Sequence, residues 1–333
     1  MDTKSIIAEI KNGLGEDYEK NIAYLGKKIE EYKSHEKVEE IMQTIDVLML
    51  EQLPPEKKEY FDNVLCIDGV RLDVLYKRVI TLMRTGNLAA AYQTICPLTD
   101  HILKHFWETE DVVYFTFENP FQHQLAGQLF RTSKTVKLAP LNFSDMFVIR
   151  GYLAIEMKHI DEAIDALEKA IAFNPINVSA YFELAEAYKL QKNMEMLLFT
   201  IKDTLKVAYT KEIIARCYCN LGYYCIEIGE HQDAIHFLIH SLTYYQNPKV
   251  TSELEHIVKT TGKEIGVPLF ADITETFQKY NQEIGPNGIV INVAETMGKK
   301  FLENNHNEMA KYCYGIVVNL TGNEESKKIY DSI

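Results

Sequence analysis

Basic residues are scarce in this sequence. Its 333 residues include 35 Lys and Arg against 48 Asp and Glu, which gives a formal net charge of −13. The first sixty residues share this acidic balance, so the total does not conceal a basic arm. Because proteins that bind nucleic acid without sequence preference depend on clustered Lys and Arg that contact phosphates, we expect no nucleic-acid partner.

Long apolar segments are missing as well. No run approaches the roughly 18 apolar residues of a membrane-spanning helix, and the N-terminal sequence MDTKSIIAEIKNGLGEDYEK lacks the apolar stretch of a signal peptide. The six cysteines lie mostly inside helical patterns, whereas a disulfide scaffold is short and rich in loops. These features predict reduced thiols in a cytoplasmic protein with no membrane contact.

Motifs for catalysis are also lacking. The sequence contains no P-loop, dinucleotide-binding fingerprint, nucleophile elbow or paired carboxylates. We therefore predict that the chain is not an enzyme, and that it has no catalytic, cofactor-binding or metal-binding residues.

What the sequence does contain is a spacing of 34 to 38 residues that recurs along the chain. The anchor at the middle of a helix pair falls at Ala163, Leu197 and Ala234, with steps of 34 and 37 residues. Weaker copies keep this interval, since Ala91 precedes Ala163 by 72 residues and Ala310 follows Ala234 by 76. Self-similarity at such a period is typical of helical repeat proteins, in which each helix pair buries its apolar face against its neighbours.

Two regions depart from the repeat. Residues 2 to 52 are predicted to form three amphipathic helices, with breaks at 13–15 and around Ser34. The segment 107–143 is irregular: an apolar run, VVYFTF, precedes Asn119-Pro120, which is typical of a helix start. Because long structureless loops are unusual in compact proteins, we expect this segment to pack, either as a distorted repeat or as a strap across the solenoid.

The three central copies resemble the tetratricopeptide repeat, most clearly from Phe147 to Pro175. The resemblance implies an all-α fold, a right-handed superhelical solenoid of paired helices. We expect an N-terminal helical cap over 1–70, the solenoid over 71–250 with the insert at 107–143, and degenerate repeats with a capping helix over 251–333. In this family small residues let the paired helices approach closely, here Gly151, Ala163, Ala170, Gly222 and Ala234.

The resemblance also implies where a partner would bind, because the first helix of each repeat lines a concave face in this family. Position by position, this gives a partner-binding groove of Tyr76, Tyr152, Glu156, Phe182, Glu183, Glu186, Lys189, Arg216, Asn220, Tyr223 and Glu227, with Lys77, Ile80 and Val148 beside them.

The chemistry of these residues predicts the kind of partner. Aromatic rings interleaved with carboxylates suit a protein or peptide with apolar anchors and some positive charge. Family members that clamp the C-terminal carboxylate of chaperones place Lys and Asn at set groove positions. Here Val148, Tyr152 and Glu183 occupy three of those positions and only Arg216 and Asn220 fit, so we do not expect an adaptor of that type.

The leading hypothesis for function is a non-catalytic scaffold that binds a protein or peptide through its concave face. The alternative is a peptide-sensing regulator that sequesters another protein, without a DNA-binding domain of its own, since residues 1 to 60 show no recognition helix. Self-association through an apolar end of the array is a further hypothesis.

Two His-x-x-x-His pairs, His101/His105 and His236/His240, come nearest to a metal site. The spacing stacks two imidazoles on one helix face, but no third ligand is signalled nearby. His236 and His240 fall on the second helix of their repeat, whose outer face is exposed in the family. We therefore expect them to be solvated surface residues.

Overall fold

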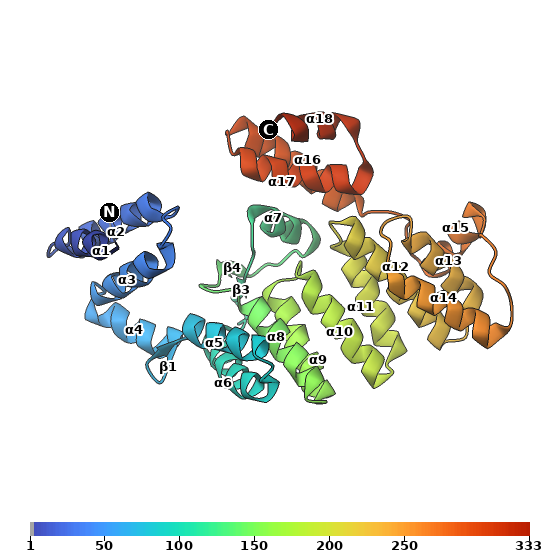
Figure 1. Cartoon of the computed structure of the whole chain (residues 1–333), viewed down its shortest axis with the longest axis horizontal. Helices are drawn as coiled ribbons and strands as arrows, with labels where there is room; N and C mark the ends of the chain where they lie inside the picture. The colour runs from blue at the N-terminus through green and yellow to red at the C-terminus, as the bar shows by residue number, and fades with distance from the viewer. Residues whose placement is uncertain (1–2) are drawn as a thin grey trace. The chain divides into compact units, whose positions relative to one another are not determined.

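The computed structural model describes residues 3–333 (Figure 1). The chain divides into two compact units, one ending at Leu75 and the other running from Tyr76 to Ile333. Within the described residues there are 18 helices and four strands, and the strands are only two to four residues long. The predicted all-α solenoid fold is therefore confirmed.

The first unit begins with three helices, α1 (Thr3–Asn12), α2 (Tyr18–Tyr32) and α3 (Val38–Glu51). They match the predicted helices, except that residue 2 lies outside the described part of the chain. Their apolar stripes meet in a small core of Ile6, Ile10, Leu25, Ile41, Ile45 and Leu48.

A fourth helix and a hairpin complete this unit. Helix α4 (Pro55–Leu65) has proline at its first position, where no backbone donor is lost. Strands β1 (Cys66–Ile67) and β2 (Val70–Arg71) pair antiparallel. Asp68 and Gly69 join them with φ angles of +50° and +77°, the left-handed conformation that two-residue hairpin turns require.

The second unit contains the repeats. Its helices are α5 (Leu72–Arg84, which begins before the boundary), α6 (Leu88–Phe106), α7 (Pro120–Leu129), α8 (Phe143–Glu156), α9 (Ile160–Phe173), α10 (Val178–Gln191), α11 (Met194–Lys206), α12 (Lys211–Glu227), α13 (His231–Ser241), α14 (Pro248–Thr261), α15 (Phe270–Lys279), α16 (Gly288–Glu303), α17 (Asn307–Thr321) and α18 (Glu324–Ser332). Its strands are β3 (Val112–Phe115) and β4 (Thr135–Leu138).

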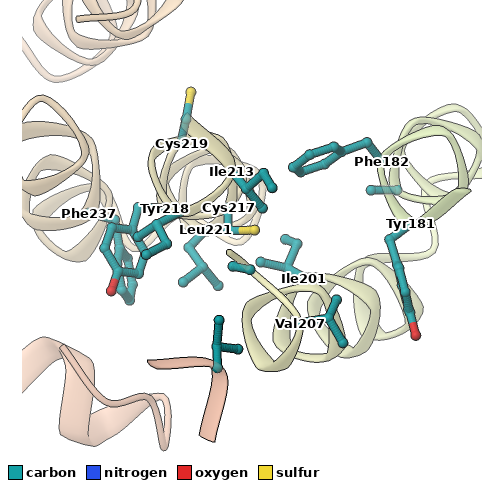
Figure 2. Packing of buried hydrophobic residues seen from close by; sticks show 14 of the residues in the cluster. Tyr181, Phe182, Ile201, Val207, Ile213, Cys217, Tyr218, Cys219, Leu221 and Phe237 are labelled. Atoms are coloured by element: carbon teal, nitrogen blue, oxygen red, sulfur yellow. The ribbon is translucent and has the colours of Figure 1, made fainter. Parts of the chain in front are cut away.

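The pairs α8–α9, α10–α11 and α12–α13 stack side by side at the centre of this unit (Figure 1). Asn177 and Asn193 cap the starts of α10 and α11, since each side-chain oxygen accepts a hydrogen bond from a backbone N–H of the first turn. Between the helices lies one continuous core, part of which is seen in Figure 2, where Cys217 and Leu221 of α12 lie close to Ile201 of α11.

The close approach within each pair depends on glycine. A Cβ atom added to Gly151 of α8 would lie 2.4 Å from Cγ of Leu167 in α9, and one added to Gly222 of α12 would lie 2.6 Å from Cγ of Leu238 in α13. Both distances are far below van der Waals contact, so the predicted need for small residues at these two positions is confirmed.

Gly151→Ala is therefore expected to destabilise the second unit by about 1–3 kcal/mol, because the new methyl group overpacks the contact with Leu167. Gly127→Ala in α7 is the matched control: beyond the adjacent backbone of its own helix, no atom of the described residues lies within 4 Å of the added Cβ, and alanine favours the helix. Urea unfolding of both variants tests this, and an equal or higher midpoint for Gly151→Ala would contradict it.

Helices α14 and α15 form no regular pair, because both pack on α13 more extensively than on each other. Helix α15 covers the outer face of α13, so the prediction that His236 and His240 are solvated is wrong: their side chains are 5% and 7% exposed. Nδ1 of His236 lies 2.7 Å from Oγ1 of Thr276 in α15, and the ring of His240 packs edge-on against that of Phe277.

The irregular segment 107–143 is a β-α-β unit. Strands β3 and β4 pair in parallel, and α7 forms the crossover between them. Asn119 caps α7 and Pro120 occupies its first turn, as the sequence predicts. The backbone N–H of Thr116 donates to the carbonyl of Phe173 at 2.9 Å, which fixes the insert to the end of α9. The segment is thus an addition to the solenoid and not a distorted repeat.

The last helix pair, α16–α17, lies against this insert. Helix α16 packs on α7, and Figure 1 shows the pair next to this helix. The ring of Tyr312 in α17 is 6.1 Å from that of Phe121 in α7. The backbone N–H of Lys211 donates to Oδ1 of Asn319 at 2.9 Å, so the pair also contacts the start of α12. The C-terminal repeat therefore turns back to the middle of the array instead of extending its end.

Candidate partner-binding groove

A pocket of about 760 Å³ lies between α10, α12 and the start of α14. Five of the eleven predicted groove residues line it: Glu186, Lys189, Arg216, Asn220 and Tyr223. We use the term groove for this pocket together with the predicted residues of α8, α10 and α12. The structure thus brings five predicted residues of α10 and α12 around one hollow.

Lys189 joins the two central helices across the pocket. Its Nζ donates to Oε1 of Glu186, one turn earlier in α10, and to Oδ1 of Asn220 in α12, both at 2.8 Å. The same ammonium lies 4.8 Å from the centre of the Tyr223 ring, within the range of a cation–π contact. This network holds Tyr223 and Asn220 in fixed positions at the pocket wall.

Phe182 is one of the predicted groove residues, but its ring is largely covered. Its side chain is only 7% exposed, and the guanidinium carbon of Arg216 lies 4.0 Å from the ring centre. Figure 2 shows the ring directed from α10 towards α12, close to Ile213. Phe182 therefore supports Arg216, which is exposed and presents its charge at the surface.

The acidic residues of the groove influence one another. Burial raises the pKa of Glu183, and the nearby carboxylates of Glu186 and Glu156 raise it further, while Arg216 lowers it. Like charges on a partly buried face repel one another, and a positively charged ligand would relieve this repulsion and favour the ionised carboxylates. The groove therefore suits a ligand with positive charge.

The remaining predicted residues lie outside the pocket. Tyr76 of α5 is half-buried, and burial together with the charge of Asp145 raises its pKa to about 12. Tyr152 of α8 is half-buried, and Glu227 at the end of α12 is exposed and lies near Tyr223.

Six lining residues of the pocket are absent from the predicted set: Leu190, Cys219, Asn247, Lys249, Ser252 and Glu253. Four of them belong to α14 or its cap, a helix that the repeat pattern did not assign to the groove. The sequence signal that could have found them is Asn247-Pro248, since Asn as N-cap and Pro at the first position mark a new helix next to the third repeat.

Other kinds of site are less well supported. Within residues 3–333, no three His, Cys, Asp or Glu side chains are gathered so that they could hold a metal ion. All six cysteines are free thiols. In the same described range, no helix is long and apolar enough to span a lipid bilayer.

Comparison with known families agrees with the helix pairs. A family model described as TPR repeat matches residues 151–192, and one described as tetratricopeptide repeat matches residues 215–248. The first match begins within α8 and runs through α9 and α10, and the second begins within α12 and runs through α13. They include Gly151 and Gly222, which allow close pairing. The chain contains tetratricopeptide repeats. Such solenoids present extended binding surfaces, and this repeat fold is that of a protein-interaction scaffold, generally without catalysis.

Solved structures show only distant likeness. The crystal structure of the apo form of RapI is 10% identical over 99% of this chain and 97% of that one, with a TM-score of 0.43. The crystal structure of the APC/C hetero-tetramer Cut9-Hcn1 is 14% identical over 90% of this chain and 58% of that one, with a TM-score of 0.34. No curated protein matches the sequence.

Proposed function

We propose that this tetratricopeptide repeat protein is a non-catalytic scaffold that binds an extended peptide segment of a protein partner in the groove. The observation that carries the proposal is the pocket of about 760 Å³. Five residues that were predicted for the groove from the repeat pattern alone line this pocket. A hollow of this size accommodates several side chains of a peptide, and a rigid wall reduces the entropy that binding costs.

The charges of the groove indicate which segment fits. Carboxylates outnumber cations there, with Glu156, Glu183, Glu186, Glu227 and Glu253 against Lys189, Arg216 and Lys249. Leu190 is 58% exposed and lines the pocket, so it offers an apolar contact. We therefore propose a partner segment with an apolar anchor and some positive charge, whose basic group lies over Glu156 and Glu183.

The test is affinity capture of the tagged full chain from its native cells, with Glu183→Gln, which removes a carboxylate proposed to contact the basic group, Tyr223→Ala and Phe199→Ala beside the wild type. Both groove variants are expected to weaken capture of the same partner by about tenfold or more, since residues at the centre of an interface dominate its affinity. Phe199→Ala is the matched control, because this ring is 57% exposed on α11 and lines a different hollow.

Circular dichroism and the unfolding midpoint must show that each variant is folded. A partner held equally by wild type and both groove variants would place the binding site elsewhere. If a short peptide alone saturates the groove and compacts the chain in small-angle scattering, the result favours the peptide-sensing alternative.

A further inference from the structure

Among residues 3–333, no strand pairs with the outer edge of β4. β4 pairs with β3 from Val112↔Thr135 to Phe115↔Leu138, and among the described residues no third strand joins this sheet. Parallel sheets are usually larger and covered on both faces, and two strands alone are marginally stable. All four residues of β4 are nevertheless exposed, including Val136 at 40% and Leu138 at 65%.

The backbone of β4 is oriented to receive another strand. On the β3 side, the N–H of Thr135 donates to the carbonyl of Asp111 and the N–H of Ala139 to that of Phe115, both at 2.8 Å. In a parallel ladder every second residue bonds to the same neighbour, so Val136 and Leu138 direct their N–H and C=O groups to the open side. Such an edge is the template that β-strand addition uses.

The charge of this segment is opposite to that of the chain. Between positions 131 and 140 the sequence has Arg131, Lys134 and Lys137 and no carboxylate, although the whole chain carries −13. Lys134 is paired with Glu108 at 2.7 Å, while Lys137 is exposed on the strand itself. Because side chains alternate along a strand, Val136 and Leu138 share one face and Lys137 lies on the other.

We propose that β4 binds an extended acidic segment of a protein partner as the third strand of this sheet. Its apolar side chains pack on Val136 and Leu138, and its carboxylates lie on the other face, beside Lys137. A second copy of this chain fits less well, because pairing β4 with itself brings like charges together. An exposed lysine on an edge also discourages such self-pairing. This surface is separate from the groove, so the proposal does not depend on the function proposed above.

The experiment uses the full chain and a capped hexapeptide in which Glu and Val alternate, and it measures binding by calorimetry. The decisive variant is Val136→Pro, which removes an outward N–H while the hydrogen bonds of Thr135 and Ala139 to β3 remain, and edge strands tolerate proline. It is expected to weaken binding by about tenfold or more, a change of about 1.4 kcal/mol. Val136→Ile, which keeps the N–H and a branched apolar side chain, is the matched control and is expected to bind like the wild type.

A second comparison keeps the protein constant, in case Val136→Pro does not fold. The same peptide with alternate backbone amides N-methylated, so that it cannot donate to β4, is expected not to bind the wild type. Arg216→Glu in the groove is expected to leave the affinity unchanged.

Four results would overturn the proposal. The first two are equal binding by folded Val136→Pro and wild type, and equal binding by the wild type of a charge-reversed hexapeptide in which Lys replaces each Glu. The other two are loss of binding in Arg216→Glu and no binding of the Glu/Val peptide up to about 1 mM.

Discussion

Phe121→Ala is expected to lower the unfolding free energy of the second unit by about 3–5 kcal/mol, the usual cost of removing a buried aromatic side chain. Phe121 lies on α7 and is fully buried, with its ring 6.0 Å from that of Tyr209 and 6.1 Å from that of Tyr312. It thereby joins three parts of the chain: the insert, the connection between α11 and α12, and the C-terminal pair α16–α17. Urea unfolding measures the loss of stability.

Hydrogen exchange shows where the loss falls. If Phe121 fixes the C-terminal pair in place, amides of α16 and α17 exchange faster in the variant than in the wild type. Phe199→Ala makes the same chemical change at a ring that is 57% exposed, and is expected to alter stability by less than about 0.5 kcal/mol. Equal stabilities of the two variants would show that the insert does not hold the pair.

The central repeats could be predicted from the sequence because their signal is local. Gly151 and Leu167, or Gly222 and Leu238, lie 16 residues apart and meet within one helix pair, so each pair leaves the same pattern in the sequence. A fixed interval between such patterns requires only that neighbouring pairs stack.

The return of α16–α17 to the middle of the array could not be predicted in this way. It depends on contacts between residues far apart in the sequence, such as Lys211 with Asn319 and Phe121 with Tyr312. The helical pattern of α16–α17 is the same whether the pair caps the end of the array or lies beside α7. The parallel pairing of β3 with β4 is likewise a contact across a helix, and the run VVYFTF alone does not reveal its partner strand.

The repeat pattern predicts part of the groove. The repeat pattern selects the face of a helix, and for Lys189, Asn220 and Tyr223 the structure places that face at one pocket. It does not select the conformation of a side chain. The stacking of Arg216 on Phe182, which largely covers the ring of a predicted groove residue, depends on two helices and on the shape of both side chains.

Mild acid is expected to destabilise the second unit through His240. The ring is 7% exposed and packs among the rings of Tyr218, Tyr244 and Phe277. Its Nε2 has no hydrogen-bond partner among the residues that the structure describes. Burial lowers the pKa of His240 in the folded chain. As the pH falls below about 6.5, His240 therefore binds a proton in the unfolded chain but stays neutral in the folded chain. The unfolding free energy then decreases by up to about 1.4 kcal/mol for each pH unit.

Unfolding free energies at pH 7.5 and pH 5 test this sign. His240→Leu removes the titrating group and is expected to lose less stability between the two values than the wild type. Tyr244→Phe changes the same cluster, but burial raises the pKa of Tyr244 from a value already near 10, so its effect should be equal at both pH values. Since carboxylates elsewhere respond to acid in all three proteins, only the difference between variants reports on His240. If the unfolding free energy of His240→Leu decreases between pH 7.5 and pH 5 as much as that of the wild type, the folded protein accommodates the charged ring. Such a result would require that α15 opens from α13.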